Sequence, residues 1–383
     1  MTIWLFIEPS DVWLFRDGKP FDAGAEHRAR SLFPPNPTTI QGALRSKLLF
    51  DSGVDLRAFA CKEAAAQRAK DWIGWPGEPP PFALRGPFIA RRTGERSVEP
   101  LFPMPADVVQ DREAKIYHLL KPLRDGGPFT ANWPSEMPQL RPLWIRSGRP
   151  LERATGWVNK AVLIGCLNGT FAPNSDDVVR EHHLFAREDR FGVAIDSARK
   201  GYREGFLYQV QFVRPRIGTG LLVAGDEKLH WPQDSGVLAL GGERRVAHFE
   251  KVAPPDEPPT KVSRSKGGKT RFKVYFATPA RFEEGWQAAD WGTWFDGKNL
   301  TLVSVAVSRF YPAGGIRVDT KSQGGDHQKA MYRYVPAGSV FFFECDGSAQ
   351  RKKDNGVLRP VTDDKCDGQI GFGQIYIGRW DYV

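Results

Sequence analysis

Residues 191–213, FGVAIDSARKGYREGFLYQVQFV, predict the kind of structure that recurs along this chain. From Phe206 to Phe212, aromatic and aliphatic residues alternate with Gln209 and Gln211. This period of two is typical of a strand with one buried face. An apolar run precedes the basic turn, so the stretch predicts a strand, a basic loop and a second strand.

Further strand candidates lie on both sides of this stretch. They are residues 3–7, 82–91, 218–225, 237–252, 271–282, 300–310, 339–345 and 368–383. Helical spacing is confined to a few segments, and Thr38 or Thr39 is expected to cap the first of them. The expected helices are residues 40–49, 56–73, 155–169 and 279–291. Many strands and few helices predict an α+β protein.

A change in composition marks the expected domain boundary. Residues 253–269, APPDEPPTKVSRSKGGK, combine four prolines with a basic Ser/Gly run, which is typical of a linker or mobile loop. We therefore expect two ferredoxin-like domains with long insertions and glycine-rich loops. The expected boundaries are 1–252 with an irregular insertion at about 75–185, 253–270 for the linker, and 271–383.

The overall charge favours an anionic partner. The 383 residues carry a net charge of +9, which suits nucleic acid, although a basic surface that only serves solubility is the alternative. The four cysteines are scattered without a CxxC pair, so neither a disulfide framework nor a zinc site is expected. No apolar run approaches the length of a membrane span, and the N-terminus does not have the pattern of a signal peptide. A cytoplasmic protein without membrane contact is the expectation.

Basic residues gather in four loops that also contain glycines, and two of these loops contain tyrosines. Glycine lets a backbone approach phosphates closely, Lys and Arg neutralise them, and tyrosines can stack on unpaired bases. Each loop taken alone is explained equally by solubility, but four of them favour RNA binding. The candidate RNA-binding residues are Arg16, Lys19, His27, Arg28, Arg30, Thr38, Thr39, Gln41, Arg45, Lys47, Arg199, Lys200, Arg203, Arg317, Lys321, Lys329, Arg333, Gly371 and Gly373.

Residues 27–49, HRARSLFPPNPTTIQGALRSKLL, explain the first group of candidates. Arginines precede a proline-rich turn, and the turn leads into a helix whose N-terminus offers free N–H groups. The strip from His27 would then reach for phosphates, while the turn fixes how the chain enters the helix. The alternative is that this segment only caps and packs the helix.

No catalytic or cofactor motif is recognised. The sequence contains no P-loop, HExxH or GxSxG, and its glycines fail the GxGxxG spacing. His182 and His183 are adjacent but lack a third metal ligand at regular spacing, so we expect no metal. His27 is the one tempting general base, and a phosphate-contacting loop histidine is the simpler interpretation. We therefore expect no catalytic residues and no cofactor.

Several stretches together resemble a known family. They are DVWLFRDGKPFDAG (11–24), SLFPPNPTTIQGALRS (31–46), GVAIDSARKGYREGFLY (192–208), LGGERR (240–245) and GFGQIYIG (371–378). In order and spacing they resemble subunit three of the Cmr complex, the subtype III-B CRISPR interference assembly, within the repeat-associated mysterious protein superfamily. Residues 75–185 carry no motif of this resemblance.

The resemblance implies two ferredoxin-like domains and a subunit without catalytic activity. It implies a grip on the repeat-derived 5′ tag of the guide RNA (crRNA), and contact with the large polymerase-like subunit and a backbone subunit. Target RNA would be contacted only indirectly. Two alternatives stay open: a metal-independent endoribonuclease of the same superfamily with His27 as general base, and a scaffold that touches only protein.

Overall fold

The computed structural model describes residues 2–16, 28–124, 140–196, 201–261, 268–316, 328–354 and 357–383. Within these ranges, residues 28, 194–196, 201–207, 315–316 and 328–329 are described by their backbone alone. Two compact units are formed from interleaved segments of the chain. Unit 1 contains Met1–Val98, Glu181–Pro254 and Pro312–Tyr332, and unit 2 contains Glu99–Arg180, Pro255–Tyr311 and Arg333–Val383.

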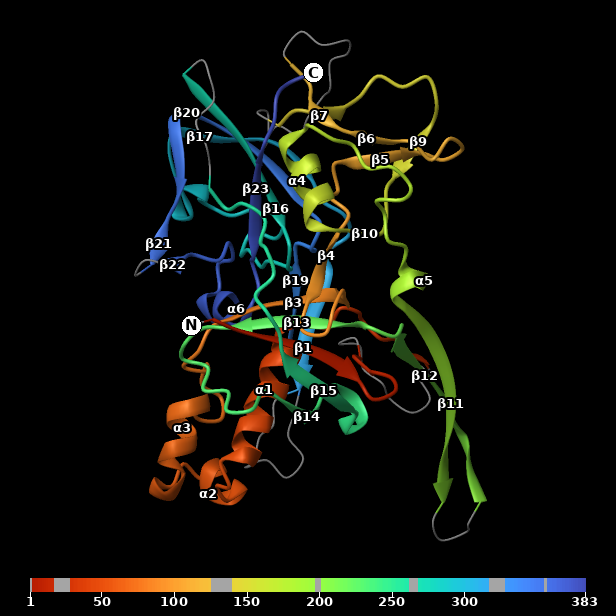
Figure 1. The fold of residues 1–383 in the computed structure, drawn as a ribbon, viewed down its shortest axis with the longest axis vertical. Helices are drawn as coiled ribbons and strands as arrows, with labels where there is room; N and C mark the ends of the chain where they lie inside the picture. Colours follow the sequence, from red (N-terminus) through yellow and green to blue (C-terminus); the bar gives the residue numbers. More distant parts are fainter. Residues whose placement is uncertain are drawn as a thin grey trace. The chain divides into compact units, whose positions relative to one another are not determined.

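The main sheet of unit 1 is antiparallel and runs in the order β3-β13-β1-β15-β14 (Figure 1). Its strands are β1 (Ile3–Pro9), β3 (Leu84–Arg92), β13 (Thr219–Gly225), β14 (Ser235–Ala239) and β15 (Val246–Lys251). β13 is buried along its whole length, which explains its continuous apolar sequence. β1 lies at the centre of the order, and its apolar run is buried from Trp4 to Ile7.

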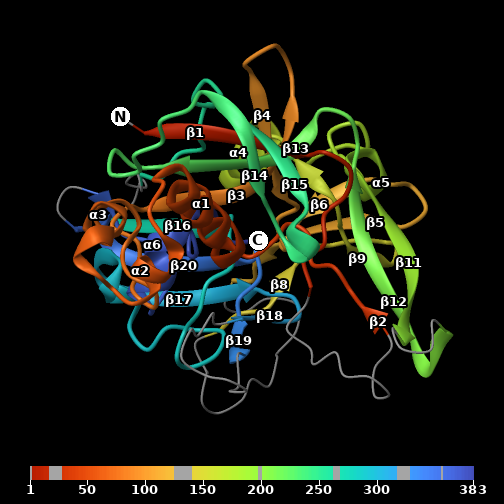
Figure 2. The same ribbon diagram turned by 90° about the horizontal axis from the view of Figure 1, so that it is seen from below.

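Helix α1 (Pro37–Asp51) packs on one face of this sheet. Ile40, Leu44 and Leu48 recur at helical spacing and join the core that contains Leu5 and Ile7. Each such buried side chain contributes about 1.5–3 kcal/mol. Two shorter helices, α2 (Leu56–Ala60) and α3 (Gln67–Ile73), extend the same core (Figure 2).

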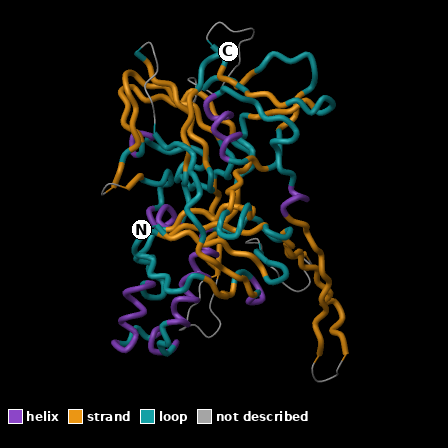
Figure 3. The backbone as a smooth tube through the Cα atoms, viewed as in Figure 1, coloured by secondary structure: helices purple, strands orange, loops and turns teal. Residues whose placement is uncertain are grey.

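A long hairpin is the second feature of unit 1. After the single-turn helix α5 (Glu181–Leu184), β11 (Phe185–Asp196) pairs with β12 (Gly201–Pro215), drawn as the extended pair of orange strands in Figure 3. The short strand β2 (Arg28–Ala29) adds to β12 in parallel. This arrangement confirms the strands predicted on both sides of residues 197–200.

The main sheet of unit 2 is also antiparallel, in the order β17-β20-β16-β23. Its strands are β16 (Lys269–Phe276), β17 (Phe295–Ala306), β20 (Val340–Arg351) and β23 (Ile375–Arg379). A core of aromatic residues packs around Phe272, Phe341 and Phe343. Helix α6 (Lys365–Ile370) precedes β23, and the turn that joins them carries Gly371 and Gly373.

Shorter elements complete unit 2. β4 (Val98–Pro103) pairs with β10 (Trp157–Val158), and helix α4 (Lys160–Asn168) confirms the helix predicted within 155–169. The remaining strands are β5 (Val108–Asp111), β6 (Tyr117–Leu119), β7 (Lys121–Pro122), β8 (Leu143–Trp144), β9 (Leu151–Arg153), β21 (Lys353–Asp354) and β22 (Val357–Leu358). A further ribbon pairs β18 (Tyr311–Ile316) with β19 (Gln328–Tyr334), and its residues from Pro312 to Tyr332 belong to unit 1.

A buried ion pair joins two parts of unit 2. Lys273 Nζ donates to Asp107 Oδ2 at 2.6 Å, and both side chains are almost fully buried. Tyr275 on the same strand donates its hydroxyl to the Pro103 carbonyl at 2.6 Å. Because an uncompensated buried charge is costly, these contacts fix the 103–107 segment against β16.

The two main sheets share one strand order. Numbered along the chain, β1, β3, β13 and β15 lie in the order 2-3-1-4, and so do β16, β17, β20 and β23. Unit 1 has α1 between its first and second strands, and unit 2 has α6 between its third and fourth. The chain is therefore a mixed α/β protein with antiparallel sheets and few helices. The single boundary predicted at 253–270 stays a prediction, although the compact units divide the chain into interleaved segments.

The predicted helix over 279–291 is wrong. Among these residues the structure has turns and isolated bridges, Phe282 with Gly285 and Glu284 with Gln287. Phe282 is buried against Trp294 and Phe276, and Gly285 has a φ of +87°. Packing of these aromatic rings overrides the helical spacing of the sequence.

Two other helix predictions need correction. The first helix begins at Pro37, not after Thr38 or Thr39, with Asn36 in an extended conformation as its N-cap. Proline suits the first helical position because no helical partner exists there for its missing N–H. The predicted helix over 56–73 is broken between α2 and α3, where Lys62 has a φ of +58°.

The four cysteines and the helix lengths bear on disulfide bonding and on membrane insertion. All four cysteines are free thiols: Cys61 and Cys366 are exposed, and Cys166 and Cys345 are buried. Within the described ranges, no helix has the length and hydropathy to span a membrane.

Candidate nucleic-acid interface

The backbone of residues 28–31 is held in place, although the sequence predicts a loop up to Arg30. Ala29 and Ser31 are buried, and Arg30 between them is exposed. Ser31 Oγ accepts a hydrogen bond from the Phe15 N–H at 3.1 Å, and its carbonyl accepts one from Arg187 Nη1 at 3.0 Å. Arg30 is therefore presented on a fixed backbone.

Phe33 explains why the proline-rich turn has a defined path. Its ring stacks on Trp13 at 5.9 Å and on Phe15 at 6.2 Å, and it meets the edge of Phe185 at 4.7 Å. Such aromatic contacts contribute beyond the area that they bury. The turn thus enters α1 from an aromatic anchor that also holds the start of β11.

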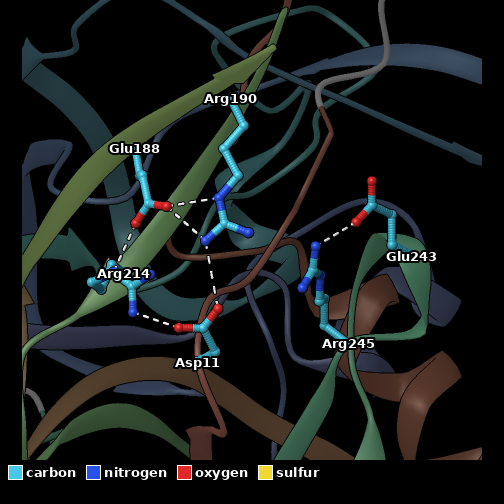
Figure 4. Close-up of polar contacts among 6 residues, drawn as sticks. All are labelled: Asp11, Glu188, Arg190, Arg214, Glu243 and Arg245. Carbon is cyan, nitrogen blue, oxygen red and sulfur yellow. Dashed lines mark hydrogen bonds and ion pairs between the residues drawn. The ribbon is translucent and has the colours of Figure 1, made fainter. Parts of the chain in front are cut away.

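Four charged side chains form a network at the base of the hairpin (Figure 4). Arg214 Nε donates to Glu188 Oε2 at 2.7 Å, and Arg214 Nη1 donates to Asp11 Oδ1 at 2.5 Å. Arg190 Nε donates to Glu188 Oε1 at 2.7 Å, and Arg190 Nη2 lies 3.5 Å from Asp11 Oδ2. Hydrogen bonds from Arg214 hold the pKa of both carboxyls below their ordinary values. The carboxylates thus stay ionised at neutral pH and keep both guanidinium groups in position.

The loop that joins β14 to β15 carries Arg244 and Arg245, and Arg245 faces the same aromatic ring as Arg190. Arg245 lies 4.9 Å from the centre of the Phe212 ring, and Arg190 lies 4.8 Å from the same ring. Arg245 Nη2 also donates to Glu243 Oε2 at 2.6 Å. We call Arg190, Arg214, Arg244 and Arg245, with the carboxylates Asp11, Glu188 and Glu243, the arginine cluster.

Arg244 differs from the other members of the arginine cluster. Glu243 and Arg244 have φ angles of +57° and +48°, a left-handed conformation that non-glycine residues rarely adopt. The loop is fixed because the Gly242 N–H donates to the Leu14 carbonyl at 2.7 Å. Arg244 is exposed and makes no hydrogen bond or ion pair with any described residue. The strained loop thus leaves the Arg244 guanidinium free of described partners, whereas Glu243 holds that of Arg245.

The predicted residues of α1 fall into different environments. Arg45 donates to the carbonyls of Gly74, Trp75 and Glu78 at 2.8–3.1 Å, and burial lowers its pKa. Lys47 pairs with Asp51 at 2.6 Å, one helical turn away. Thr38, Thr39 and Gln41 are half-buried in the first turns of the helix. Arg45 thus anchors α1, and the geometry gives no support to its predicted RNA contact.

The glycines of the terminal turn serve the fold of unit 2. Gly371 ends α6 with a φ of +116°, and its carbonyl accepts a hydrogen bond from Thr278 Oγ1 at 2.8 Å. A Cβ on Gly373 would lie 2.6 Å from the Val361 carbonyl oxygen. A side chain at Gly373 would therefore collide with the Val361 backbone, while RNA contact by the two glycines stays a prediction.

The other predicted residues are placed as follows. Arg16 is exposed and its backbone bridges to Ser31, while Arg333 is exposed with its guanidinium 4.9 Å from the Phe310 ring centre. Arg28, Arg203 and Lys329 lie in β2, β12 and β19 and are described by backbone alone. Outside the described residues lie Lys19, His27, Arg199, Lys200, Arg317 and Lys321. RNA contact by any of these residues stays a prediction.

Sequence reasoning missed Arg190, Arg214, Arg244 and Arg245 as members of one site. Asp11 and Arg214 are 203 residues apart, so no local pattern connects them. The LGGERR stretch contains Arg244 and Arg245, but its glycines alone are a weak signal. Within the described ranges, no group of three or more His, Cys, Asp or Glu is arranged to hold a metal ion.

Comparison with known proteins identifies the family. The model of the family described as CRISPR-associated protein (Cas_Cmr3) matches residues 5–380. This chain belongs to the Cmr3 family. The predicted family is thus confirmed, and with it a subunit of a type III-B CRISPR complex.

One solved structure is similar in fold at low sequence identity. A chain in the cryo-EM structure of the Type III-B Cmr-beta bound to cognate target RNA and AMPPnP is similar, with a TM-score of 0.50 at 14% identity. The match covers 98% of this chain and 99% of that chain. A chain of Cmr-beta bound to cognate target RNA matches at a TM-score of 0.46 and 15% identity, over 88% of this chain and 86% of that one. No curated protein sequence matches.

Proposed function

We propose that this Cmr3-family chain is a non-catalytic RNA-binding subunit that grips the repeat-derived 5′ tag of the crRNA. In the assembly it bridges the large polymerase-like subunit and a backbone subunit. One observation carries the tag-binding part: Arg30 and Arg244 are both exposed without a carboxylate partner among the described residues, and fixed backbone presents both.

The two arginines flank one small apolar cluster, formed by Val12, Leu14, Ala29, Val210 and Phe212. Arg30 directly follows Ala29 of this cluster, and the loop of Arg244 bonds to Leu14. Two preorganised guanidinium groups on one cluster suit successive phosphates of an RNA strand. The net charge of +9 adds a sequence-independent attraction to any RNA.

The strand orders support two ferredoxin-like domains within the proposal. Both main sheets have the order 2-3-1-4, which is the order of a βαββαβ fold read from the other edge. Each unit keeps one of the two expected helices, α1 in unit 1 and α6 in unit 2. Paired domains of this kind are what the family resemblance implies.

The test compares variants of the full chain for binding to RNA that carries the repeat-derived tag. Replacing Arg30 and Arg244 with alanine should weaken binding and reduce the salt slope by about 1.4, which corresponds to two phosphates on single-stranded RNA. The Lys62→Ala and Lys70→Ala double variant removes the same charge from ion-paired positions and should leave the slope unchanged. Equal slopes for both double variants would refute this interface.

Incubation of the same RNA with the chain in EDTA tests the non-catalytic part. We expect intact RNA after incubation, both with the wild-type chain and with His27→Ala. Site-specific cuts that disappear in His27→Ala would identify a metal-independent nuclease. Photo-crosslinking of crRNA in the assembled complex separates a tag-binding subunit from a scaffold that touches only protein.

A further inference from the structure

A second exposed group of arginine and aromatic side chains lies in unit 2, apart from the arginine cluster. Phe310 is 43% exposed, so part of its ring faces solvent. Arg333 lies 4.9 Å from the centre of the ring and Arg309 lies 5.9 Å from it. Both arginines are exposed. We call Arg309, Phe310 and Arg333 the Phe310 patch.

Neighbouring residues fix the position of the Phe310 patch. Phe310 directly precedes β18, and Arg333 lies near the end of β19, with which β18 pairs (Figure 2). Tyr334, next to Arg333, is buried: its ring stacks on Phe372 at 4.8 Å and its hydroxyl donates to Asp367 at 2.9 Å. Because successive side chains of a strand point to opposite faces, a buried Tyr334 holds Arg333 outward.

The charge of the Phe310 patch is uncompensated. Neither Arg309 nor Arg333 forms a hydrogen bond or ion pair with a carboxylate among the described residues. Arg190 and Arg214, by contrast, are held by Asp11 and Glu188. A guanidinium stacked on a ring uses its flat face and keeps its N–H edge for an anion. The Phe310 patch therefore offers two open donor edges beside an exposed aromatic surface.

We propose that the Phe310 patch binds one nucleotide of single-stranded RNA, with the phosphate on Arg309 and Arg333 and the base against Phe310. This inference rests on the proposed RNA-binding function and adds a site in unit 2. An acidic peptide would satisfy the two arginines but would leave the phenyl ring in water. A nucleotide joins an anion to an aromatic surface and so matches both features.

The experiment measures binding of a fluorescein-labelled single-stranded RNA to the full chain as a function of salt. Replacing Arg309 and Arg333 with glutamine should reduce the salt slope by about 0.7, which corresponds to the one phosphate that the two arginines share. Phe310→Ala should weaken binding about five- to 100-fold, the range for loss of one stacked base, while Phe310→Tyr should restore it. The Lys298→Gln and Lys353→Gln double variant is the matched control, since both lysines are exposed in unit 2.

Two outcomes would overturn the inference. If both double variants bind RNA as the wild-type chain does, the Phe310 patch is rejected and the proposed function stays intact. No RNA binding by the wild-type chain would reject both proposals.

Because Phe310→Ala can also affect folding, UV crosslinking of the wild-type chain in the assembled complex gives a readout without substitution. A crosslink from the peptide of Phe310 to RNA supports the site, and a crosslink only to a protein subunit rejects it in favour of a protein contact.

Discussion

At the scale of single residues, Gly373 shows how a sequence motif acquires a structural role. Its φ of +68° lies in the left-handed region, and a Cβ would lie within 2.6–3.0 Å of three backbone atoms of Val361. Backbone atoms cannot move aside as a side chain can. The turn also depends on the hydrogen bond from the Val361 N–H to the Gly373 carbonyl at 2.8 Å. Glycine is thus required at position 373, because the turn and the backbone of Val361 approach each other closely.

We predict that Gly373→Ala destabilises the chain by about 2–4 kcal/mol, from the left-handed backbone and the collision together. Gly347→Ala is the control, because Gly347 has a φ of +74° but nothing within 4 Å of its Cβ position. It should cost only about 1–2 kcal/mol. Urea denaturation measures both variants. Equal losses would show that Val361 moves aside and that only the backbone conformation matters.

At the scale of elements, α1 is fixed by apolar contacts on one face and by Arg45 on another. The Arg45 guanidinium donates to three carbonyls of residues 74–78, the segment that follows α3. Buried carbonyls need donors, and this single side chain supplies them. The helix and that segment are therefore held together by one residue that the sequence suggests for phosphate binding.

Replacing Arg45 with methionine keeps the apolar stem and removes the donors. We expect a loss of about 1.5–3 kcal/mol in the free energy of unfolding, because hydrogen bonds to charged groups are involved. RNA affinity at constant salt should be unchanged. Lys47→Gln, which breaks only an ion pair one turn away, should cost about 0.5 kcal/mol or less. A stable Arg45→Met chain with weakened RNA binding would instead return Arg45 to the interface.

The hairpin depends on a charge network with a definite pH dependence. Arg214 lowers the folded-state pKa of Asp11 and Glu188 below their unfolded values. A carboxyl group with a depressed folded pKa contributes stability above its unfolded pKa, and this contribution is lost as pH falls through the folded value. The network is therefore complete at neutral pH, where RNA would bind, and weakens only in acid.

At the scale of the whole molecule, unit 2 contains a chemical reporter of its own unfolding. Cys166 in α4 is fully buried, and burial raises the pKa of its thiol to about 12. The thiolate is the reactive form, so the native chain at neutral pH presents almost none at this position. Cys61 in unit 1 is exposed.

Alkylation with iodoacetamide across a urea gradient, read by mass spectrometry, should label Cys61 in native buffer. Cys166 should be labelled only where near-UV circular dichroism shows loss of tertiary structure. Labelling of Cys166 at the rate of Cys61 in native buffer would contradict the packing of α4.

Local patterns in the sequence determined much of this molecule by themselves. The strands of the two main sheets and of the β11–β12 hairpin followed from alternation or continuous apolar runs, and α4 followed from an apolar helical segment, because these signals arise from burial of neighbouring residues. The family followed from motifs spread along the chain, and the family match confirmed it. The GFG turn before the last strand was also visible in the sequence.

Only the tertiary structure decided which elements and charges meet. Residues 279–291 have helical spacing, but their aromatic rings bury themselves in the core of unit 2 and no helix forms there. Arg45 and Arg244 look alike in the sequence, yet one is bound by three carbonyls and the other is exposed. The physical reason is distance along the chain. Charge pairing joins Asp11 and Arg214 across 203 positions, and strand pairing joins β1 with β15, whereas sequence periodicity reports only on neighbours.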